Sequence, residues 1–467
     1  MKLFKRKLAK KLLPVAVLST LAFGSLAGPF SNHEAEASSK KGHYNSSQHE
    51  NTKIKNVIFL IGDGMGVSYT SAYRYLKNNP NTPVAERTEF DKYLVGQQMT
   101  YPEDPNQNVT DSASAATAMS AGVKTYNAAI AVDNDKSEVK TVLEAAKEKG
   151  KATGLVATSE ITHATPASFG AHDANRNNMN SIADDYFDEM IKGNHKVDVL
   201  LGGGKSNFVR ADRDLTKEFK KAGFSYVTDK NQMLKDRNDQ VLGLFAPGGL
   251  PKMIDRAKEI PSLQDMTNSA IDRLSKDKDG FFLMVEGSQI DWAGHDNDIV
   301  GAMSEMEDFE KAYKAAIEFA KKDKHTLVVA TADHSTGGYS IGANGDYNWF
   351  GEPIKAAKRT PDFMAAEIAG GADPEKTLKK YIDQSLLKLS AAEIESVKDA
   401  AASKDVTKID NAIEAIFNKH SNTGWTTGGH TGEDVPVYAF GPYKERFAGQ
   451  VDNTDQAKII FDLLKSK

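Results

Sequence analysis

Serines, an acid and small helix-forming residues are concentrated in Val109–Gly122, whose sequence is VTDSASAATAMSAG. Asp111 is a typical helix N-cap and Gly122 a typical helix end, so a helix is predicted between them. Ser112 would then lie on the first turn, beside free backbone N–H groups and the positive end of the helix dipole. A serine there could carry negative charge, or bind an anion, during a reaction. Close packing of small side chains is the alternative explanation for this composition.

Residues that could bind metal ions follow short apolar segments along the chain. These segments are typical of strands buried inside a sheet; they are Asn56–Ile61, Thr153–Thr158, Val197–Leu201, Phe281–Val285, Thr326–Thr331 and Val435–Phe440. The possible ligands after them are Asp63, Thr165, Glu286, Asp291, Asp333 and His334. His295 lies four positions after Asp291, so a helix would place both on one face, where they could bind one ion.

Helical segments alternate with these strands. This predicts an α/β fold with a central, mainly parallel sheet that helices flank on both faces. In such sheets the site lies beyond the carboxyl ends of the strands. A site that uses both Asp63 and His430 requires them in one domain, so we expect a single catalytic domain over 54–467. Residues 351–418 are predicted to be a helical insertion in it, with a capping box at Ser390–Glu393.

The segment Ser159–Arg176 is predicted to be a loop after a strand, and it is dense in residues with ligand chemistry. These residues are His163, Thr165, His172, Asp173 and Arg176. Taken singly, a histidine in such a loop is more commonly an ordinary polar contact than a ligand. A helix is expected before this loop, over Lys140–Glu148, because Gly150 would end it.

The N-terminus has the pattern of a secretory signal peptide over residues 1–37. An apolar stretch, Leu12–Ala27, follows six basic residues, and Ala35-Glu36-Ala37 offers a cleavage site. Cleavage there would remove six basic and two acidic residues, which lowers the formal net charge from −5 to −9. Residues 38–53 are polar and predicted to be a flexible leader. We therefore expect a protein that is secreted or associated with the cell envelope.

Composition excludes several classes of function. No later segment is apolar and long enough to be predicted as transmembrane. The chain has no cysteine, so an exported form would depend on its core or on metals for stability. Its acidic balance argues against nucleic acid as a specific partner. The run GGGKS at 202–206 lacks the first glycine of a P-loop, since that position is Val199, so nucleotide binding is not expected.

The possible ligands separate into chemically distinct sets. Nitrogen and oxygen donors suited to zinc occur in Asp291, His295 and His430, and again in Asp63, Asp333 and His334. Thr165, Glu286 and a second oxygen of Asp63 form an all-oxygen set better suited to magnesium. Two zinc ions about 4 Å apart could bind the attacking and leaving oxygens of a displacement at phosphorus, and could lower the pKa of Ser112. Four carboxylates against three divalent ions leave a charge of about +2, and Arg176 adds one more, which favours an anionic substrate.

The motifs together resemble those of the alkaline phosphatase family, from about Asn56 to the C-terminus. They are DGMG at 63–66, TDSASAAT at 110–117, ATP at 164–166, Glu286-Gly287 with Asp291 and His295, TADHS at 331–335 and GGHTGEDVP at 428–436. The order of the motifs along the chain matches the family throughout, which makes the resemblance highly specific.

The resemblance implies a role for each of these residues. Ser112 would be the nucleophile that forms a phosphoserine, and Arg176 a bidentate phosphate clamp. The first zinc would be bound by Asp291, His295 and His430, the second by Asp63, Asp333 and His334, and magnesium by Asp63, Thr165 and Glu286, with cobalt possible in place of one or more of these ions. The family is usually homodimeric and hydrolyses a broad range of small phosphomonoesters at alkaline pH.

Two positions depart from the best-known bacterial pattern. His163 stands where that pattern has an aspartate, and Trp292 stands where it has a lysine. The resemblance puts both just outside the ligand shell, so the metal at the third site and the pH optimum could differ. Alternatives remain open: a phosphodiesterase of the same superfamily, or an extracellular phosphate- or metal-binding protein. A sulfatase is not expected, because the sequence after Ser112 lacks a C/S-x-P-x-R signature.

Overall fold

The computed structural model describes residues 53–79 and 81–465. The predicted signal peptide, and the leader apart from Lys53, lie outside the described residues. The described residues belong to one compact unit. Among their helices, none combines the length and the apolar character needed to cross a membrane. The domain boundaries that we expect from the sequence stay a prediction.

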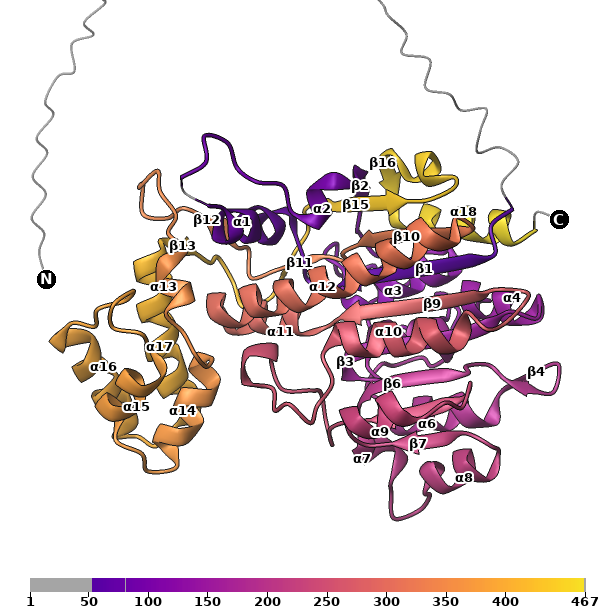
Figure 1. Ribbon diagram of the computed structural model, residues 1–467, viewed down its shortest axis with the longest axis horizontal. Helices are drawn as coiled ribbons and strands as arrows, with labels where there is room; N and C mark the ends of the chain where they lie inside the picture. Colours follow the sequence, from indigo (N-terminus) through magenta and orange to yellow (C-terminus); the bar gives the residue numbers. More distant parts are fainter. Residues whose placement is uncertain (1–52, 80, 466–467) are drawn as a thin grey trace, which may run out of the picture. The chain divides into compact units, whose positions relative to one another are not determined.

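A ten-stranded sheet forms the centre of the fold (Figure 1). Its strands lie in the order β16 (Gly449–Asp452), β2 (Leu94–Met99), β15 (Val435–Phe440), β10 (Thr326–Thr331), β1 (Asn56–Gly62), β9 (Phe281–Gly287), β3 (Ala152–Glu160), β6 (Val199–Gly203), β8 (Val241–Leu244) and β7 (Ser225–Val227). Strand β15 runs antiparallel to both of its neighbours, and the other strands of this sheet run in one direction. The predicted mainly parallel sheet is confirmed.

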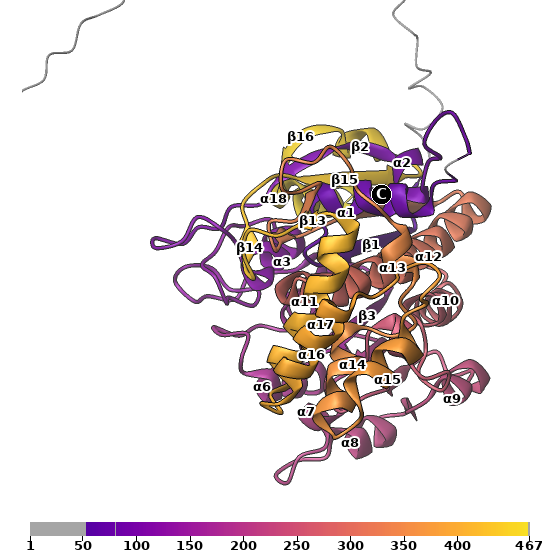
Figure 2. The same ribbon diagram turned by 90° about the vertical axis from the view of Figure 1, so that its left-hand side faces the viewer.

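Helices cover both faces of this sheet (Figures 1 and 2). Strand β1 shows why: Ile58 and Leu60 belong to one buried cluster, while Val57, Phe59 and Ile61 belong to the other. The first cluster includes residues of α1 (Val67–Lys77), α10 (Leu263–Leu274) and α12 (Ile299–Asp323). The second includes residues of α3 (Ser112–Ala121), α4 (Val142–Glu148), α5 (Ala164–Gly170), α6 (Met179–Asp188), α8 (Leu215–Lys221) and α18 (Asn453–Lys465).

A group of helices lies beside the sheet, drawn in orange at the left of Figure 1. It consists of α13 (Glu352–Lys355), α14 (Pro361–Ala369), α15 (Pro374–Tyr381), α16 (Ala391–Ala401) and α17 (Val406–Ser421). The capping box at Ser390 and Glu393 is present at the start of α16. Helix α17 extends beyond residue 418, where the sequence placed the end of the insertion. It ends at Ser421, because the next residue, Asn422, has a left-handed conformation.

The remaining elements are short, apart from α11, which carries two of the possible ligands. The helices are α2 (Glu89–Lys92), α7 (Lys205–Phe208), α9 (Lys230–Lys235), α11 (Gln289–Asp296), η2 (Met253–Asp255) and η3 (Lys444–Phe447). Three two-stranded ladders pair β11 (Ser335–Thr336) with β14 (His430–Thr431), β12 (Ser340–Ile341) with β13 (Thr423–Gly424), and β4 (Met190–Ile191) with β5 (Asn194–His195).

Three local predictions differ from the structure. The expected loop over Ser159–Arg176 contains helix α5, whose buried small residues pack against α3. The proline in this helix, Pro166, lies in its first turn, where the missing N–H costs no hydrogen bond. Helix α4 begins two residues later than expected, because Thr141 caps it through a capping box with Glu144. Strand β6 is shifted from 197–201 to 199–203, because the Asp198 carboxylate accepts the Thr153 N–H at the point where pairing would begin.

Candidate metal centre

The residues predicted to do chemistry meet at one edge of the sheet. Asp63 follows β1, Glu286 lies near the end of β9, and Asp333 and His334 follow β10. These three strands are adjacent and parallel, so their carboxyl ends lie together. Helix α3 brings its N-terminus to the same place.

Ser112 is the first residue of α3, as the sequence predicts. The Asp111 carboxylate caps the helix by accepting the Ser114 N–H at 2.9 Å, and Gly122 ends it in a left-handed conformation. The Ser112 side chain is almost fully buried, with 1% exposed. Its Oγ lies 3.1 Å from His334 Nε2 and 3.4 Å from Asp63 Oδ1. The hydroxyl therefore faces possible ligands from two different strands.

Asp291, His295 and His430 form the first ligand group, with one atom from each within 4.8 Å of the others. His295 Nε2 lies 3.3 Å from Asp291 Oδ2 across one turn of α11, and 3.2 Å from His430 Nε2. The Nδ1 atoms point the other way, to Gly428 O at 2.7 Å and Thr110 O at 2.9 Å. Carbonyl partners on Nδ1 fix the rings so that Nε2 is free to bind a metal.

Asp63, Asp333 and His334 form the second ligand group. His334 Nε2 lies 3.4 Å from Asp63 Oδ1 and 3.3 Å from Asp333 Oδ2. The Asp333 Oδ1 atom accepts the Gly64 N–H at 3.0 Å. Gly64 has a φ of 69°, and a Cβ there would lie 2.6 Å from Thr336 Oγ1. The turn after β1 therefore needs glycine at this position to bring Asp63 against Asp333.

Asp63, His163 and Glu286 form a third group, which shares Asp63 with the second. The described residues include buried polar atoms that have no hydrogen-bond partner, and several belong to these sites: Asp63 Oδ2, His163 Nδ1, Thr165 Oγ1, Glu286 Oε1 and Asp333 Oδ2. Leaving buried polar atoms unpaired is costly, so their convergence fits bound cations. The resemblance puts His163 outside the ligand shell, yet one of its ring nitrogens lies close enough to Asp63 and Glu286 to be a ligand itself.

The electrostatics of the buried carboxyl groups support the same conclusion. Burial and the charge of Asp333 raise the pKa of Asp63 well above its usual range. Burial raises the pKa of Glu286 to about 7 and that of Asp333 to about 6. Burial acts on Asp291 too, but the hydrogen bond from His295 and the charges of nearby histidines lower its pKa. Without cations, three of the four carboxyl groups thus resist ionisation.

Arg176 completes the site on the side of α3. Its Nη1 donates to Asp111 Oδ2 at 3.0 Å, and its Nη2 lies 3.1 Å from His163 Nε2. The Trp292 ring meets the His163 ring edge-on, with centroids 5.8 Å apart. The residues to which the resemblance gives a role therefore lie in this one region, whereas His172 lies in a separate group with Glu144 and Glu189. Their individual roles stay predictions.

Sequence reasoning missed residues that orient the ligands. The hydroxyl groups of Ser288 and Ser159 donate to Glu286 Oε2 at 2.6 and 3.2 Å. The Thr336 hydroxyl donates to Asp291 Oδ1. Ser288 lies only two positions after Glu286, but the strand ends at Gly287 and Ser288 has a helical backbone, so strand alternation does not signal its role. Thr336 had no signal either, since its partner Asp291 is far away in sequence.

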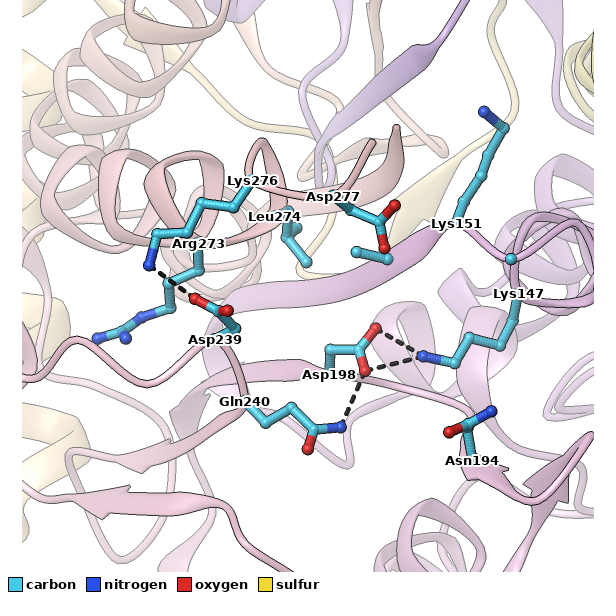
Figure 3. A pocket seen from close by; sticks show the side chains of 12 residues that line it. Lys147, Lys151, Asn194, Asp198, Asp239, Gln240, Arg273, Leu274, Lys276 and Asp277 are labelled. Carbon is cyan, nitrogen blue, oxygen red and sulfur yellow. Dashed lines mark hydrogen bonds and ion pairs between the residues drawn. The ribbon is translucent and has the colours of Figure 1, made fainter. Parts of the chain in front are cut away.

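A separate cavity of about 340 Å³ lies at the opposite edge of the sheet (Figure 3). Its lining includes residues just before β6 and β8, among them Asp198 and Gln240. Two ion pairs lie within it: Lys147 Nζ lies 2.7 Å from Asp198 Oδ2, and Lys276 Nζ lies 2.6 Å from Asp239 Oδ1. We assign this cavity no function.

Comparison with known proteins gives a consistent result. A sequence model of the alkaline phosphatase family matches residues 54–466. The chain is 76% identical over 460 residues to alkaline phosphatase 3 of Bacillus subtilis, covering 98% of each chain. The range of the family match includes every residue of the three ligand groups.

Solved structures agree with this match. A cold-active alkaline phosphatase from a psychrophilic Shewanella species superposes with a TM-score of 0.82 at 40% identity, covering 88% of this chain and 100% of that one. A second similar structure is a variant of the alkaline phosphatase from the Antarctic bacterium TAB5, with a histidine replaced by aspartate and Mg bound in its M3 site. It superposes with a TM-score of 0.65 at 32% identity, covering 89% of this chain and 99% of that one.

Proposed function

The chain belongs to the alkaline phosphatase family, and from this premise we propose that it is a secreted, metal-dependent phosphomonoesterase acting through a phosphoserine at Ser112. One observation carries the proposal: the buried Ser112 Oγ lies at a helix N-terminus, 3.1 Å from His334 Nε2 and 3.4 Å from Asp63 Oδ1. The proposed nucleophile therefore lies at one place together with possible metal ligands and Arg176. A phosphate ester is the substrate class that uses all three.

We assign two zinc ions and one magnesium ion to the ligand groups. The first zinc would be held by Asp291, His295 and His430, the second by Asp63, Asp333 and His334, and magnesium by Asp63, Thr165 and Glu286. When bound, these ions neutralise developing charge on the phosphoryl oxygens and favour the ionised form of the serine. The mixed nitrogen and oxygen donors of the first two groups also admit cobalt.

The protein's own residues then perform a two-step displacement. The Ser112 hydroxyl loses its proton and Oγ attacks phosphorus, the bond to the leaving alcohol oxygen breaks, that oxygen takes up a proton, and a phosphoserine forms. Water next loses a proton and attacks phosphorus, the bond to Ser112 Oγ breaks, and inorganic phosphate and the reprotonated serine are released. The N-terminal N–H groups of α3 favour negative charge beside Ser112. Arg176 binds two phosphoryl oxygens, and Asp111 holds its guanidinium in place.

The rates on p-nitrophenyl phosphate and on its bis-ester, with and without chelator, test this function. We expect the mono-ester to be hydrolysed far faster, over a broad range of small leaving groups, at alkaline pH, and only with metal present. A faster reaction on the bis-ester would show a phosphodiesterase instead. Phosphate binding without turnover of either ester would show a binding protein.

We also propose export and a homodimer. The predicted signal peptide supports export, and N-terminal sequencing of protein from the culture medium should begin at Ser38. An aromatic surface supports a dimer: Tyr75 and Tyr347 have exposed fractions of 56% and 102%, and both line one cavity. A second copy of the chain would cover these apolar groups. Light scattering should give twice the mass of the mature chain.

Replacing Arg176 with alanine should weaken inhibition by phosphate about 10- to 100-fold, the range expected for a lost charged hydrogen bond. The maximal rate should change less, because the guanidinium binds substrate and transition state alike. Inhibition constants and kcat on p-nitrophenyl phosphate measure both effects. Arg237→Ala removes an exposed arginine outside the site and serves as the control. Equal phosphate inhibition in Arg176→Ala and the unmodified enzyme would refute the clamp.

The double change His163→Asp with Trp292→Lys should raise magnesium affinity at the third site and tighten phosphate inhibition, each about 10-fold. A carboxylate in place of the imidazole supplies the oxygen that magnesium prefers, while His163 Nδ1 favours zinc or cobalt. The TAB5 variant with Mg in its M3 site also has aspartate in place of a histidine. At 292, a lysine adds a cation near the phosphate.

Metal titrations and phosphate inhibition constants on the two single variants assign each effect. His163→Asp alone should move magnesium affinity, and Trp292→Lys alone should move phosphate inhibition. If neither value shifts in the double variant, these two positions only pack against each other and do not tune the site.

A further inference from the structure

A second cluster of titratable side chains lies away from the three ligand groups. Atoms of Glu144, His172 and Glu189 lie within 4.8 Å of one another. Lys196, whose side chain is 1% exposed, contacts Glu189 Oε2 and lies 3.8 Å from Glu144 Oε1. Because this ammonium already supplies positive charge between the two glutamates, we treat the cluster as an ion-pair network. The catalytic proposal leaves His172 without a role.

Both ring nitrogens of His172 are engaged. Nδ1 lies 2.8 Å from the carbonyl oxygen of Ala131, and Nε2 lies 2.9 Å from Glu144 Oε1. Both partners accept hydrogen bonds, so the ring satisfies both only when each nitrogen carries a proton. Burial opposes that charge, but the hydrogen bond and charge of Glu144 raise the pKa of His172. His172 thus joins the start of α4 to the segment that contains Ala131.

That segment, residues 128–131, is paired with the segment 172–176 that carries Arg176. The N–H of Ile130 donates to Asp173 O, and the N–H of Asp173 donates to Ile130 O, each at 2.9 Å. The N–H of Arg176 donates to Ala128 O at 2.9 Å. At the end of this pairing away from Arg176, the His172 side chain adds a contact with the carbonyl oxygen of Ala131. The backbone position of Arg176 is therefore set by residues 128–131.

The segment 128–131 has an unusual backbone that needs support. Ala128 and Ala131 have φ values of 75° and 43°, which side chains with a Cβ rarely adopt. Hydrogen bonds oppose this strain: Asp111 Oδ2 accepts the Ala128 N–H, and Thr117 Oγ1 accepts the Ala131 N–H, each at 2.9 Å. The same Asp111 oxygen accepts Arg176 Nη1. A shift of this segment would therefore move both the backbone of Arg176, which is hydrogen-bonded to Ala128, and its guanidinium, which is hydrogen-bonded to Asp111.

We propose that His172 is a positioning residue for Arg176, which it orients through the contact with Ala131 and the ion pair with Glu144. The proposal rests on the proposed function, in which Arg176 binds the phosphoryl group. The hydrogen-bond partners of the His172 ring are Ala131 O and Glu144 Oε1, neither of which belongs to the three ligand groups. Its effect on phosphate should therefore pass through the arginine, and should vanish when the arginine is absent.

A double-mutant cycle with inorganic phosphate as the probe tests this. His172→Phe keeps a ring but loses both contacts, and should weaken phosphate inhibition about 10-fold when Arg176 is present and less than about 2-fold in the Arg176→Ala background. The kcat should fall less than the inhibition constant rises. His172→Asn can still donate to Ala131 O and should recover part of the loss.

A matched control is His195→Phe, which alters another part-buried histidine, one that contacts Phe187 O but not residues 128–131 or 172–176. It should leave phosphate inhibition unchanged. Equal weakening by His172→Phe in both backgrounds, or none in either, would overturn the proposal. Loss of one zinc per chain from the His172→Phe holoenzyme would also overturn it, in favour of a metal site. If instead Arg176→Ala itself leaves phosphate inhibition unchanged, the proposed function fails rather than the role of His172.

Discussion

Ser112→Ala should lower kcat on p-nitrophenyl phosphate at least about 10³-fold, while the zinc and magnesium content stays near that of the unmodified enzyme. The serine supplies the oxygen that forms the covalent intermediate, whereas each of the three ligand groups has three carboxylate or imidazole donors besides it. We expect Asp63, Asp333 and His334 to stay in place without it, because other contacts, such as the Gly64 N–H on Asp333 Oδ1, also hold this group. The remaining rate would come from direct attack of water on the bound ester.

Ser120→Ala is the matched control, since Ser120 lies on the same helix and is also fully buried. Its hydroxyl donates to Ser168 O at 2.6 Å, away from the ligand groups. This variant should keep its activity. Acid quenching of the unmodified enzyme with labelled phosphate should trap the label on Ser112, because hydrolysis of the phosphoserine slows at low pH. Activity of Ser112→Ala at the unmodified level would show that the nucleophile is another group.

Local patterns in the sequence were sufficient for the elements that position the site. Strands β10 and β15 have the predicted bounds, because continuous apolar runs with turn residues on either side depend little on their partners. The helix of Ser112 was also predictable, since its cap and its terminating glycine are local signals. Once the strands were known to be parallel, their carboxyl ends had to meet, and Asp63, Glu286 and Asp333 with them.

Contacts between distant segments could not be predicted in the same way. Helix α5 forms where a loop was expected, because its small residues gain stability only by packing against α3. The hydrogen bond from Thr336 to Asp291 joins residues from α11 and β11, and no spacing in the sequence encodes it. His163 illustrates the same limit: the sequence places it near the site, but only the fold shows that one of its ring nitrogens lies near carboxylate oxygens of Asp63 and Glu286.

Removal of the metal ions is the second change for which we expect a large effect. Asp63, Glu286, Asp291 and Asp333 are at most 3% exposed and lie in groups that share one edge of the sheet. Without cations, a charge on one of these carboxyl groups opposes ionisation of the others, and Asp63 Oδ2, Glu286 Oε1 and Asp333 Oδ2 have no hydrogen-bond donor within the described residues. The chain has no cysteine, so no disulfide compensates for this loss.

Chelation should therefore abolish activity and lower Tm by about 10 °C or more. This magnitude follows if the ions contribute about 10 kcal/mol of binding free energy and unfolding of about 410 residues has an entropy of about 0.9 kcal/mol/K. Calorimetry of the holoenzyme and the chelated enzyme measures the shift, and zinc with magnesium should restore both activity and Tm. The Ser112→Ala variant keeps every ligand, so chelation should lower its Tm by as much as it lowers that of the unmodified enzyme. This control separates the effect on stability from turnover. If the metal-free protein has the same Tm as the holoenzyme, metal binding at these groups contributes nothing to the stability of the fold.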